Sequence, residues 1–194
     1  MELNDFLCNY LQRLNSSLKH IDADTLSEFL KDLSSIWLHR NTLFICGNGG
    51  SAGNAIHLAN DFTYGVGYSK TDSVPGLSVE ALPSNSAVIT CLANDISYTS
   101  IFSQQLLAKA NSNDILLCLS GSGNSPNIVS AIETANQIGM KTYSIVAFDG
   151  GRCKELSTKS FHIPTSDMQI AEDSQLVIGH LCMQWLNINK GSLI

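Results

Sequence analysis

Residues 44–57 read FICGNGGSAGNAIH, and this stretch decides the fold of the 194-residue chain. It begins like a buried strand, continues as a glycine-rich turn and ends with the composition of a helix. Residues 116–129, LLCLSGSGNSPNIV, repeat the order of strand, polar glycine loop and helix. Two such units predict a parallel sheet with both loops at its carboxyl edge, where open α/β sheets bind their ligands.

The rest of the chain extends this pattern. The first forty residues have apolar positions at helical spacing, which predicts two helices packed as a hairpin. From residue 42 onward, short apolar runs alternate with amphipathic segments, so we expect an α/β three-layer sandwich with a five-stranded, mainly parallel sheet of the flavodoxin-like type. The expected strands are 43–46, 77–82, 115–120, 142–148 and 160–163, and the expected helices are near 51–64, 84–92, 98–110, 125–139 and 169–189.

Composition limits the class of partner. Only 14% of the residues are charged while 44% are hydrophobic, so we expect part of the surface to be covered by another copy of the chain. The net charge of −6 and the lack of a Lys/Arg run argue against nucleic acid. No segment approaches 18 consecutive apolar residues, so we expect no membrane span. The six cysteines include no CxxC pair, which is typical of reduced core thiols in a cytoplasmic protein.

The second loop, residues 120–125, has the features of a phosphate site. Ser120, Ser122 and Ser125 supply three hydroxyls, and Gly121 lets the backbone approach a ligand closely. The loop ends at a helix start, where free N–H groups favour an anion. A plain helix-capping turn is the alternative, because Ser and Asn are common capping residues.

The first loop also fits another kind of site. Gly47, Gly49 and Ala52 match the G-x-G-x-x-A form of a dinucleotide-binding turn. That site needs an acid at the end of the following strand, whereas Asp72 lies in the polar loop KTDSVPG. A nicotinamide cofactor is therefore disfavoured. Neither loop contains the G-K-[ST] or G-x-S-x-G signature of nucleotide hydrolysis or of serine hydrolases.

Ionisable side chains occur on two of the expected helices. His57 and Asp61 are four residues apart, so they share a helix face and can meet one ion or substrate group; a core histidine beside a solvated Asp61 is the alternative. Glu172, Asp173 and His180 lie on the last helix. Glu172 and His180 are separated by about 12 Å along a continuous helix. If both serve one kind of site, we expect one of them to come from a neighbouring subunit.

Several ordered motifs carry a resemblance to a known family. They are CGNGGSAGNAIH (46–57), AND (93–95), LSGSGNS (119–125), GMKTYSIVAFDGG (139–151) and the helix that contains His180. Over nearly its full length the chain resembles the sugar isomerase (SIS) family, and most closely the phosphoheptose isomerases. The resemblance implies a SIS domain over residues 41–194, N-terminal helices over 1–40 that form a tetramer, and sites shared between subunits.

The resemblance also implies roles for individual residues. Asp61 and His180 would be catalytic and move protons between carbons 1 and 2 of the sugar. Asp61 stands where relatives have Glu, and Glu172 where they have Gln, yet a His/Asp/Glu/His set still suits zinc. The implied zinc ligands are His57, Asp61, Glu172 and His180, and the implied substrate contacts are Asn48, Gly49, Gly50, Ser51, Asp61, Asn94, Asp95, Ser120, Gly121, Ser122, Ser125 and Glu172.

The expected activity is aldose–ketose isomerisation of a small sugar phosphate through an enediol or enediolate. The resemblance implies that sedoheptulose 7-phosphate becomes D-glycero-D-manno-heptose 7-phosphate, a heptose precursor for lipopolysaccharide or capsule. One alternative is a silent SIS protein that binds a partner, similar to the DnaA-associated replication regulators. Those relatives lack the acid that follows the first histidine and the late histidine, both of which this chain has. A second alternative is an isomerase of another sugar phosphate.

Overall fold

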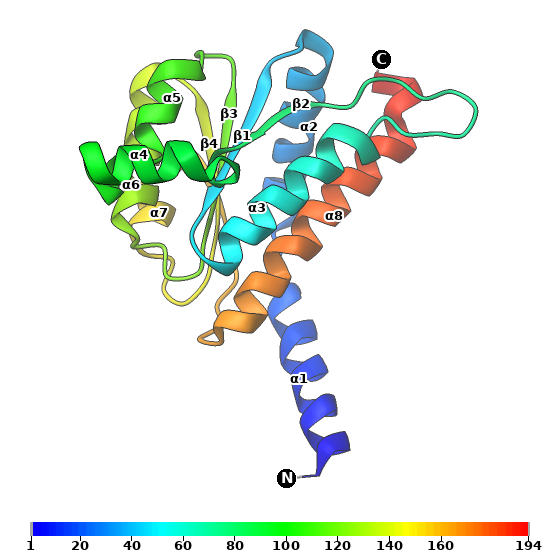
Figure 1. The fold of residues 1–194 in the computed structure, drawn as a ribbon. Coiled ribbons are helices and arrows are strands. Elements are labelled where there is room, and N and C mark those ends of the chain that lie inside the picture. Colours follow the sequence, from blue (N-terminus) through cyan, green and yellow to red (C-terminus); the bar gives the residue numbers. More distant parts are fainter. Residues whose placement is uncertain (1, 194) are drawn as a thin grey trace.

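A computed structural model describes residues 2–193 and, within them, one sheet of five strands (Figure 1). The strand order is β2-β1-β3-β4-β5, and each neighbouring pair is parallel, which confirms the predicted sheet. In register, Cys46 of β1 faces Cys118 of β3. The strands are β1 (Thr42–Gly47), β2 (Ser78–Ala81), β3 (Ile115–Ser120), β4 (Lys141–Val146) and β5 (Lys159–His162).

The central strands are apolar on both faces because helices cover both sides of the sheet. Along β1, Leu43 and Ile45 belong to one buried cluster, and Phe44 and Cys46 belong to the other. The first cluster is covered by α2 (Ala23–His39), α3 (Gly50–Asn60) and α8 (Met168–Leu193), and the second by α4 (Ser86–Asp95), α5 (Ser103–Lys109), α6 (Pro126–Ile138) and α7 (Gly151–Leu156) (Figure 1).

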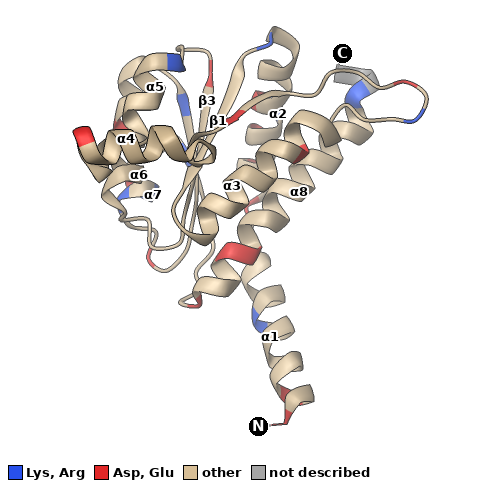
Figure 2. Ribbon diagram, viewed as in Figure 1, with Lys and Arg blue, Asp and Glu red and all other residues tan. Residues whose placement is uncertain are grey.

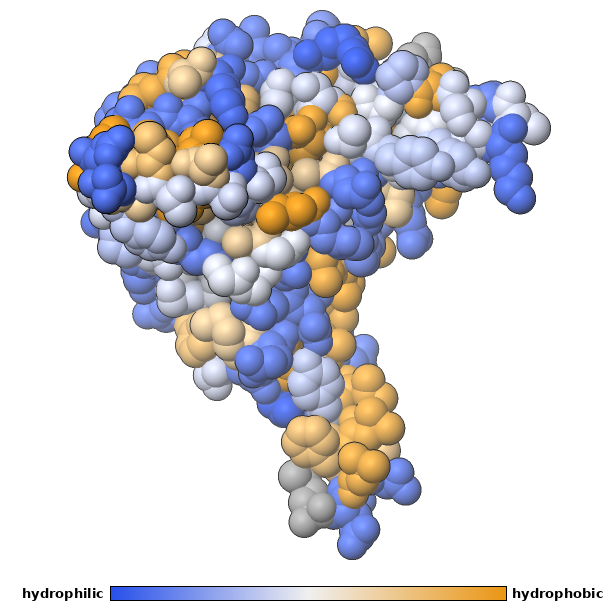
Figure 3. Space-filling view, in the orientation of Figure 1, coloured by the Kyte–Doolittle hydropathy of each residue, from blue (hydrophilic) through white to orange (hydrophobic). Residues whose placement is uncertain are grey.

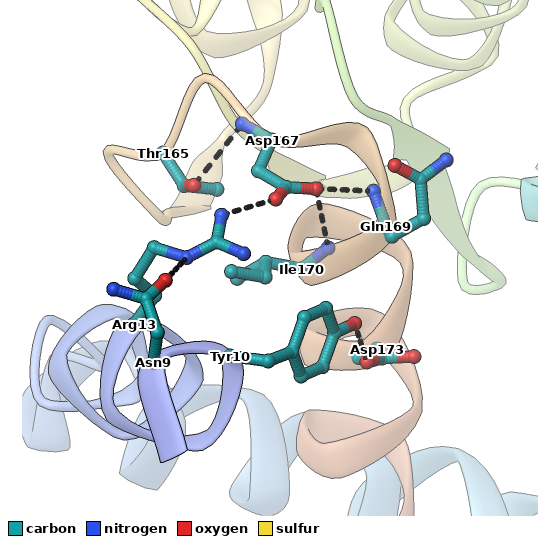
Figure 4. Close-up of polar contacts among 8 residues, drawn as sticks. All are labelled: Asn9, Tyr10, Arg13, Thr165, Asp167, Gln169, Ile170 and Asp173. Carbon is teal, nitrogen blue, oxygen red and sulfur yellow. Dashed lines mark hydrogen bonds and ion pairs between the residues drawn. The ribbon is translucent and has the colours of Figure 1, made fainter. Parts of the chain in front are cut away.

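Both predicted N-terminal helices are present (Figure 1). The first, α1 (Leu3–Leu18), projects from this body, and α2 follows it after a short turn. Two polar contacts fasten α1 to the start of α8 (Figure 4). Tyr10 Oη donates to Asp173 Oδ2 at 2.6 Å, and Arg13 Nη1 pairs with Asp167 Oδ2 at 2.5 Å. The other Asp167 oxygen accepts two backbone N–H groups of the first turn of α8, so one carboxylate both caps that helix and holds α1.

Three helical details differ from the sequence-based expectation. The helix expected over 51–64 is α-helical only to Asn60 and continues as a π-helical turn over Asp61–Gly65. The segment 98–110 is divided into a 3₁₀ turn (Tyr98–Ser100) and α5. The short helix α7 was not predicted, because six residues are too few to show a helical period.

The charged residues are scattered thinly over the ribbon (Figure 2). Within residues 2–193, no helix has both the length and the apolar character needed to cross a membrane. The six cysteines are free thiols, and four of them are buried.

Candidate active site

The two glycine-rich loops meet at the carboxyl edge of the sheet because β1 and β3 are neighbours there. Between the loops lies a cavity of about 270 Å³. Nine of the predicted substrate contacts line it, together with Leu119 and Met168. The nine are Asn48, Gly49, Gly50, Ser51, Ser120, Gly121, Ser122, Ser125 and Glu172.

The serine hydroxyls of this cavity are oriented by hydrogen bonds that leave their protons free. Ser51 Oγ accepts from Gln175 Nε2 at 3.0 Å, and the Ser120 and Ser122 oxygens accept backbone N–H groups of their own loop at 3.2 and 3.3 Å. A hydroxyl that accepts one bond can still donate another. Ser125 begins α6 without making a side-chain capping bond. The loop is therefore suited to donate to an anion, and the capping alternative has no support at Ser125.

The backbone of the second loop is held by close packing against the loop after β4. Gly123 has φ +67°, and a Cβ at this position would lie 2.0 Å from the carbonyl oxygen of Gly150. Asn124 Oδ1 accepts the backbone N–H of Arg152 at 3.0 Å. A side chain at position 123 would push the two loops apart, so the glycine fixes the shape of the cavity.

A larger cavity, of about 660 Å³, opens at the opposite edge of the sheet beside Asp32, Asn113 and Lys141. Its carboxylates already have partners. Asp32 Oδ1 lies 2.7 Å from Lys141 Nζ and Asp32 Oδ2 accepts from Tyr143 Oη at 2.6 Å, while Asp114 accepts two backbone N–H groups. Ligands of open parallel sheets bind at the carboxyl ends of the strands. The smaller cavity is therefore the better candidate for the active site.

Three predicted metal ligands form one group farther along the same helices that line this cavity, on α3, the π turn and α8. His57 Nε2 lies 3.0 Å from His180 Nε2, and Asp61 Oδ2 lies 3.5 Å from His57 Nε2 and 3.3 Å from His180 Nε2. Tetrahedral zinc with bonds of about 2.0–2.2 Å holds its ligand atoms roughly 3.3–3.6 Å apart. Both Asp61–histidine separations fall in this range, and the His57–His180 separation of 3.0 Å is slightly shorter. Two imidazoles and one carboxylate are suitable zinc donors, so the chemistry of the group fits this metal.

His180 meets His57 within one chain, so this histidine does not have to come from a neighbouring subunit. The helices α3 and α8 lie side by side (Figure 1). Their close approach depends on Gly179, where a Cβ would lie 2.3 Å from Leu58 Cδ2. Asn54 Nδ2 adds hydrogen bonds to the Glu172 carbonyl and to a side-chain oxygen of α8.

Glu172 is not part of this three-residue group. It lies two helical turns before His180, and its carboxylate is beside Gly50, where an added Cβ would be 2.4 Å from Oε1. The expectation that Glu172 shares one metal site with His57, Asp61 and His180 has no support in this geometry, because the helical rise carries Glu172 away from the group. Glu172 instead places a negative charge in the cavity.

The remaining predicted contacts, Asn94 and Asp95, lie exposed at the end of α4. Asn94 Nδ2 donates to Asp95 Oδ1 at 2.7 Å, and Asp95 Oδ2 accepts from Cys91 Sγ at 3.4 Å. Within the described chain they are not among the cavity-lining residues. These hydrogen bonds keep the pKa of Asp95 below its usual value.

Sequence reasoning missed Gln175 and Asn127, which hold cavity residues in place by side-chain hydrogen bonds. Gln175 is three residues after Glu172 on α8, a spacing that places both on the face toward α3. That spacing was a usable signal. Asn127 gave none, because an Asn in the first turn of a helix is common.

Comparison with known proteins identifies the family. The model of the SIS domain family matches residues 8–147. A phosphoheptose isomerase of Chlorobaculum parvum is 31% identical over 183 residues, covering 94% of this chain and 87% of the relative. Another, from Helicobacter pylori, is 35% identical over 162 residues and covers 81% and 82% of the two chains. The chain belongs to the phosphoheptose isomerase family.

Solved structures of phosphoheptose isomerases have the same fold. The enzyme of Neisseria gonorrhoeae superposes with a TM-score of 0.85 at 21% identity, over 96% of this chain and 99% of that one. The Francisella tularensis enzyme gives 0.83 at 23% identity, over 96% and 99%. The sheet and its surrounding helices therefore match those of the two solved enzymes along almost the whole chain.

The close packing at Gly179 leads to a testable prediction. Replacing Gly179 with Ala forces α8 away from Leu58 and should cost about 1–3 kcal/mol of unfolding free energy. The same shift would separate His180 from His57 and weaken metal binding. Chemical denaturation and zinc titration measure the two effects. Gly53→Ala is the matched control, because a Cβ at Gly53 meets nothing within 4 Å; equal effects of the two substitutions would contradict the prediction.

Proposed function

We propose that this protein is a zinc-dependent phosphoheptose isomerase that converts sedoheptulose 7-phosphate to D-glycero-D-manno-heptose 7-phosphate. The relatives from Chlorobaculum parvum and Helicobacter pylori carry the name of this activity. The observation that carries the proposal is an anion-type cradle and a His/Asp/His group on the same pair of helices. This combination supplies both a phosphate anchor and acid–base groups.

The spacing of the two parts suits such a substrate. Ser51 lines the cavity and His57 belongs to the three-residue group, and six residues of helix separate them by about 9 Å along the axis. A heptulose 7-phosphate has its phosphate at one end and its reacting carbons at the other. We therefore place the phosphate in the serine cradle and carbons 1 and 2 near Asp61 and His180.

The chain's own residues can perform the proton transfers. Asp61 removes the proton from carbon 1 next to the keto group with Oδ1, and His180 moves a proton between the two oxygens of the enediol or enediolate at Nδ1. Asp61 Oδ2 and His180 Nε2 then remain available to hold zinc. The proton is then returned to carbon 2, so no net oxidation or reduction occurs and no redox cofactor is required. Bound zinc, held by His57, Asp61 and His180, would polarise the carbonyl and stabilise negative charge on its oxygen.

The direct test is a substrate panel. The purified protein, supplemented with zinc, is incubated with ketose phosphates of five, six and seven carbons, and the products are followed by nuclear magnetic resonance. We expect sedoheptulose 7-phosphate to give the highest kcat/KM. Faster conversion of a shorter ketose would favour the isomerase of another sugar phosphate. Failure to convert any of them would favour the silent, partner-binding alternative.

The three-residue group favours an enzyme over that silent alternative. A protein that only binds a partner gains nothing from two imidazoles and a carboxylate within 4.8 Å of one another. Such clusters of ionisable groups are typical of functional sites.

We also propose a homotetramer in which residues 1–40 mediate assembly and 41–194 form the SIS domain. The apolar side chains of α1 form an exposed patch along the projecting helix (Figure 3). Exposed apolar patches of this kind mark interaction sites. Light scattering in solution should give the mass of four chains. The patch comprises Leu3, Phe6, Leu7 and Leu11.

The free thiols support a reducing, cytoplasmic location. Burial raises the pKa of Cys153 and Cys182 to about 12, so these thiols stay protonated and unreactive at neutral pH.

Glu172 is the residue of the cavity that opposes phosphate binding. Its carboxylate lies at the start of α3, where free N–H groups would otherwise favour an anion. Glu172→Gln removes this repulsion, worth about 1 kcal/mol at high effective dielectric, and should lower KM about fivefold. Initial-rate kinetics at low ionic strength measure the change. Bound zinc should remain at the wild-type ratio, and a loss of zinc would instead make Glu172 a metal ligand.

A further inference from the structure

We infer that Asn127 is a positioning residue for the reaction, which fixes the amide of Asn48 so that it can only donate a hydrogen bond to the substrate. This inference rests on the proposed function, because it takes the cavity as the substrate site. Asn48 lines the cavity, whereas Asn127 lies behind it in the first turn of α6 and is fully buried.

The two amides form a reciprocal pair. Asn48 Nδ2 donates to Asn127 Oδ1 at 2.8 Å, and Asn127 Nδ2 donates to Asn48 Oδ1 at 2.8 Å. A pair of this kind remains satisfied if both amides rotate by half a turn, so the pair alone does not decide which atom of Asn48 faces which way.

A backbone group removes this ambiguity. The N–H of Ile128 donates to Asn127 Oδ1 at 3.1 Å. Because a backbone N–H can only donate, an oxygen must occupy that position. The orientation of Asn127 is therefore set by the helix, and Asn127 in turn sets the orientation of Asn48.

The pair also uses up the acceptor capacity of Asn48. Its Oδ1 accepts from Asn127 Nδ2 and from Tyr98 Oη, the second bond measuring 3.1 Å. An amide oxygen has two lone pairs, and both are then engaged. The second N–H of Asn48 Nδ2 is the hydrogen-bonding group left for a ligand. Asn48 thus selects an acceptor oxygen, which we assign to the phosphate because the cradle serines surround the same cavity.

The experiment is Asn127→Asp, studied by kinetics from about pH 5 to about pH 8.5, a range that covers carboxyl pKa values raised by burial. The protonated carboxylic acid has the shape and hydrogen-bonding pattern of the amide, and its O–H can donate to Asn48 Oδ1. The carboxylate cannot donate, so Asn48 Oδ1 loses this donor and faces a carboxylate oxygen. The repulsion displaces the Asn48 amide from the orientation in which its N–H donates to the phosphate. The wild-type enzyme is measured in parallel so that ionisation of the substrate phosphate cancels in the ratio.

We expect the ratio of variant to wild-type KM to rise at least tenfold with pH, while kcat stays within about threefold, as for loss of a binding contact. Asn136→Asp is the matched control on the same helix, because Asn136 is exposed and bonds to Leu156 and Thr142. Its KM ratio should not change with pH. Thermal melting at each pH verifies that the variants are folded.

Asn127→Ser serves as a second variant if the buried carboxyl prevents folding. One hydroxyl cannot replace both amide bonds, so KM should rise severalfold with no added pH dependence. A flat KM ratio in Asn127→Asp, or an unchanged KM in Asn127→Ser, would overturn the inference. Wild-type turnover in the same assay separates this outcome from failure of the proposed function.

Discussion

Replacing Asp61 with Asn lowers kcat for sedoheptulose 7-phosphate by about 10²- to 10⁴-fold, the range expected when a general base is removed. The amide has nearly the shape of the carboxylate but cannot accept a proton at neutral pH. In the structure Asp61 Oδ2 faces both His57 and His180, so the substitution removes the anionic group at the centre of the site. Single-turnover assays on zinc-loaded protein measure the chemical step separately from metal binding.

Two controls keep this result specific. Asp61→Glu retains a carboxylate and should recover much of the lost activity, since the family resemblance implies Glu at this position. Asp24→Asn removes the same charge from an exposed position in the first turn of α2 and should leave kcat unchanged. Full activity in Asp61→Asn would show that another group removes the proton.

Loss of zinc is the second large effect. His57→Ala and His180→Ala each remove one of three ligand atoms that lie 3.0–3.5 Å apart. Each should weaken zinc binding by more than about 100-fold, because even outer partners of metal ligands contribute 10- to 100-fold. Metal analysis after dialysis should give about one zinc per wild-type chain and little in either variant.

The histidine His39 provides a matched control. It is exposed on α2, and its Nδ1 bonds to the carbonyl of Ser35, away from the site. His39→Ala should bind zinc like the wild type. If His57→Ala and His180→Ala also keep stoichiometric zinc, the three-residue group is not the metal site.

The sheet and most helices could be predicted from periodicity because the buried strands are uniformly apolar. All six residues of β3, Ile115–Ser120, are buried, and the run stands out between two polar segments. The glycines of the first loop likewise marked the carboxyl end of β1. Features shorter than one or two periods, such as α7 and the π turn at Asp61, left no such pattern.

The arrangement of α8 against α3 was beyond sequence reasoning. The eight-residue separation predicted correctly that Glu172 and His180 lie far apart on one helix. Assigning both residues to one site then led to the prediction that one of them comes from a neighbouring subunit. The structure divides them between the cavity and the three-residue group of His57, Asp61 and His180. The residue that makes this possible, Gly179, looks unremarkable in sequence, since only the position of Leu58 shows why a side chain cannot fit.

The site residues were predicted from motifs, and their supports were not. Ser51 and Asn48 belong to the first glycine-rich loop, whereas Gln175 and Asn127 hold them from other helices. The contact between Asn48 and Asn127 spans 79 positions of the chain, and the contact between Ser51 and Gln175 spans 124. No local sequence pattern encodes contacts over such separations.

One comparison tests the central claim most directly. Wild-type protein and the Asp61→Asn variant, both zinc-supplemented, are incubated with sedoheptulose 7-phosphate while nuclear magnetic resonance follows the aldose product. The site described above predicts steady formation of heptose 7-phosphate by the wild type and at most one hundredth of that rate by the variant. Equal rates, or no product from the folded wild-type protein, would contradict it.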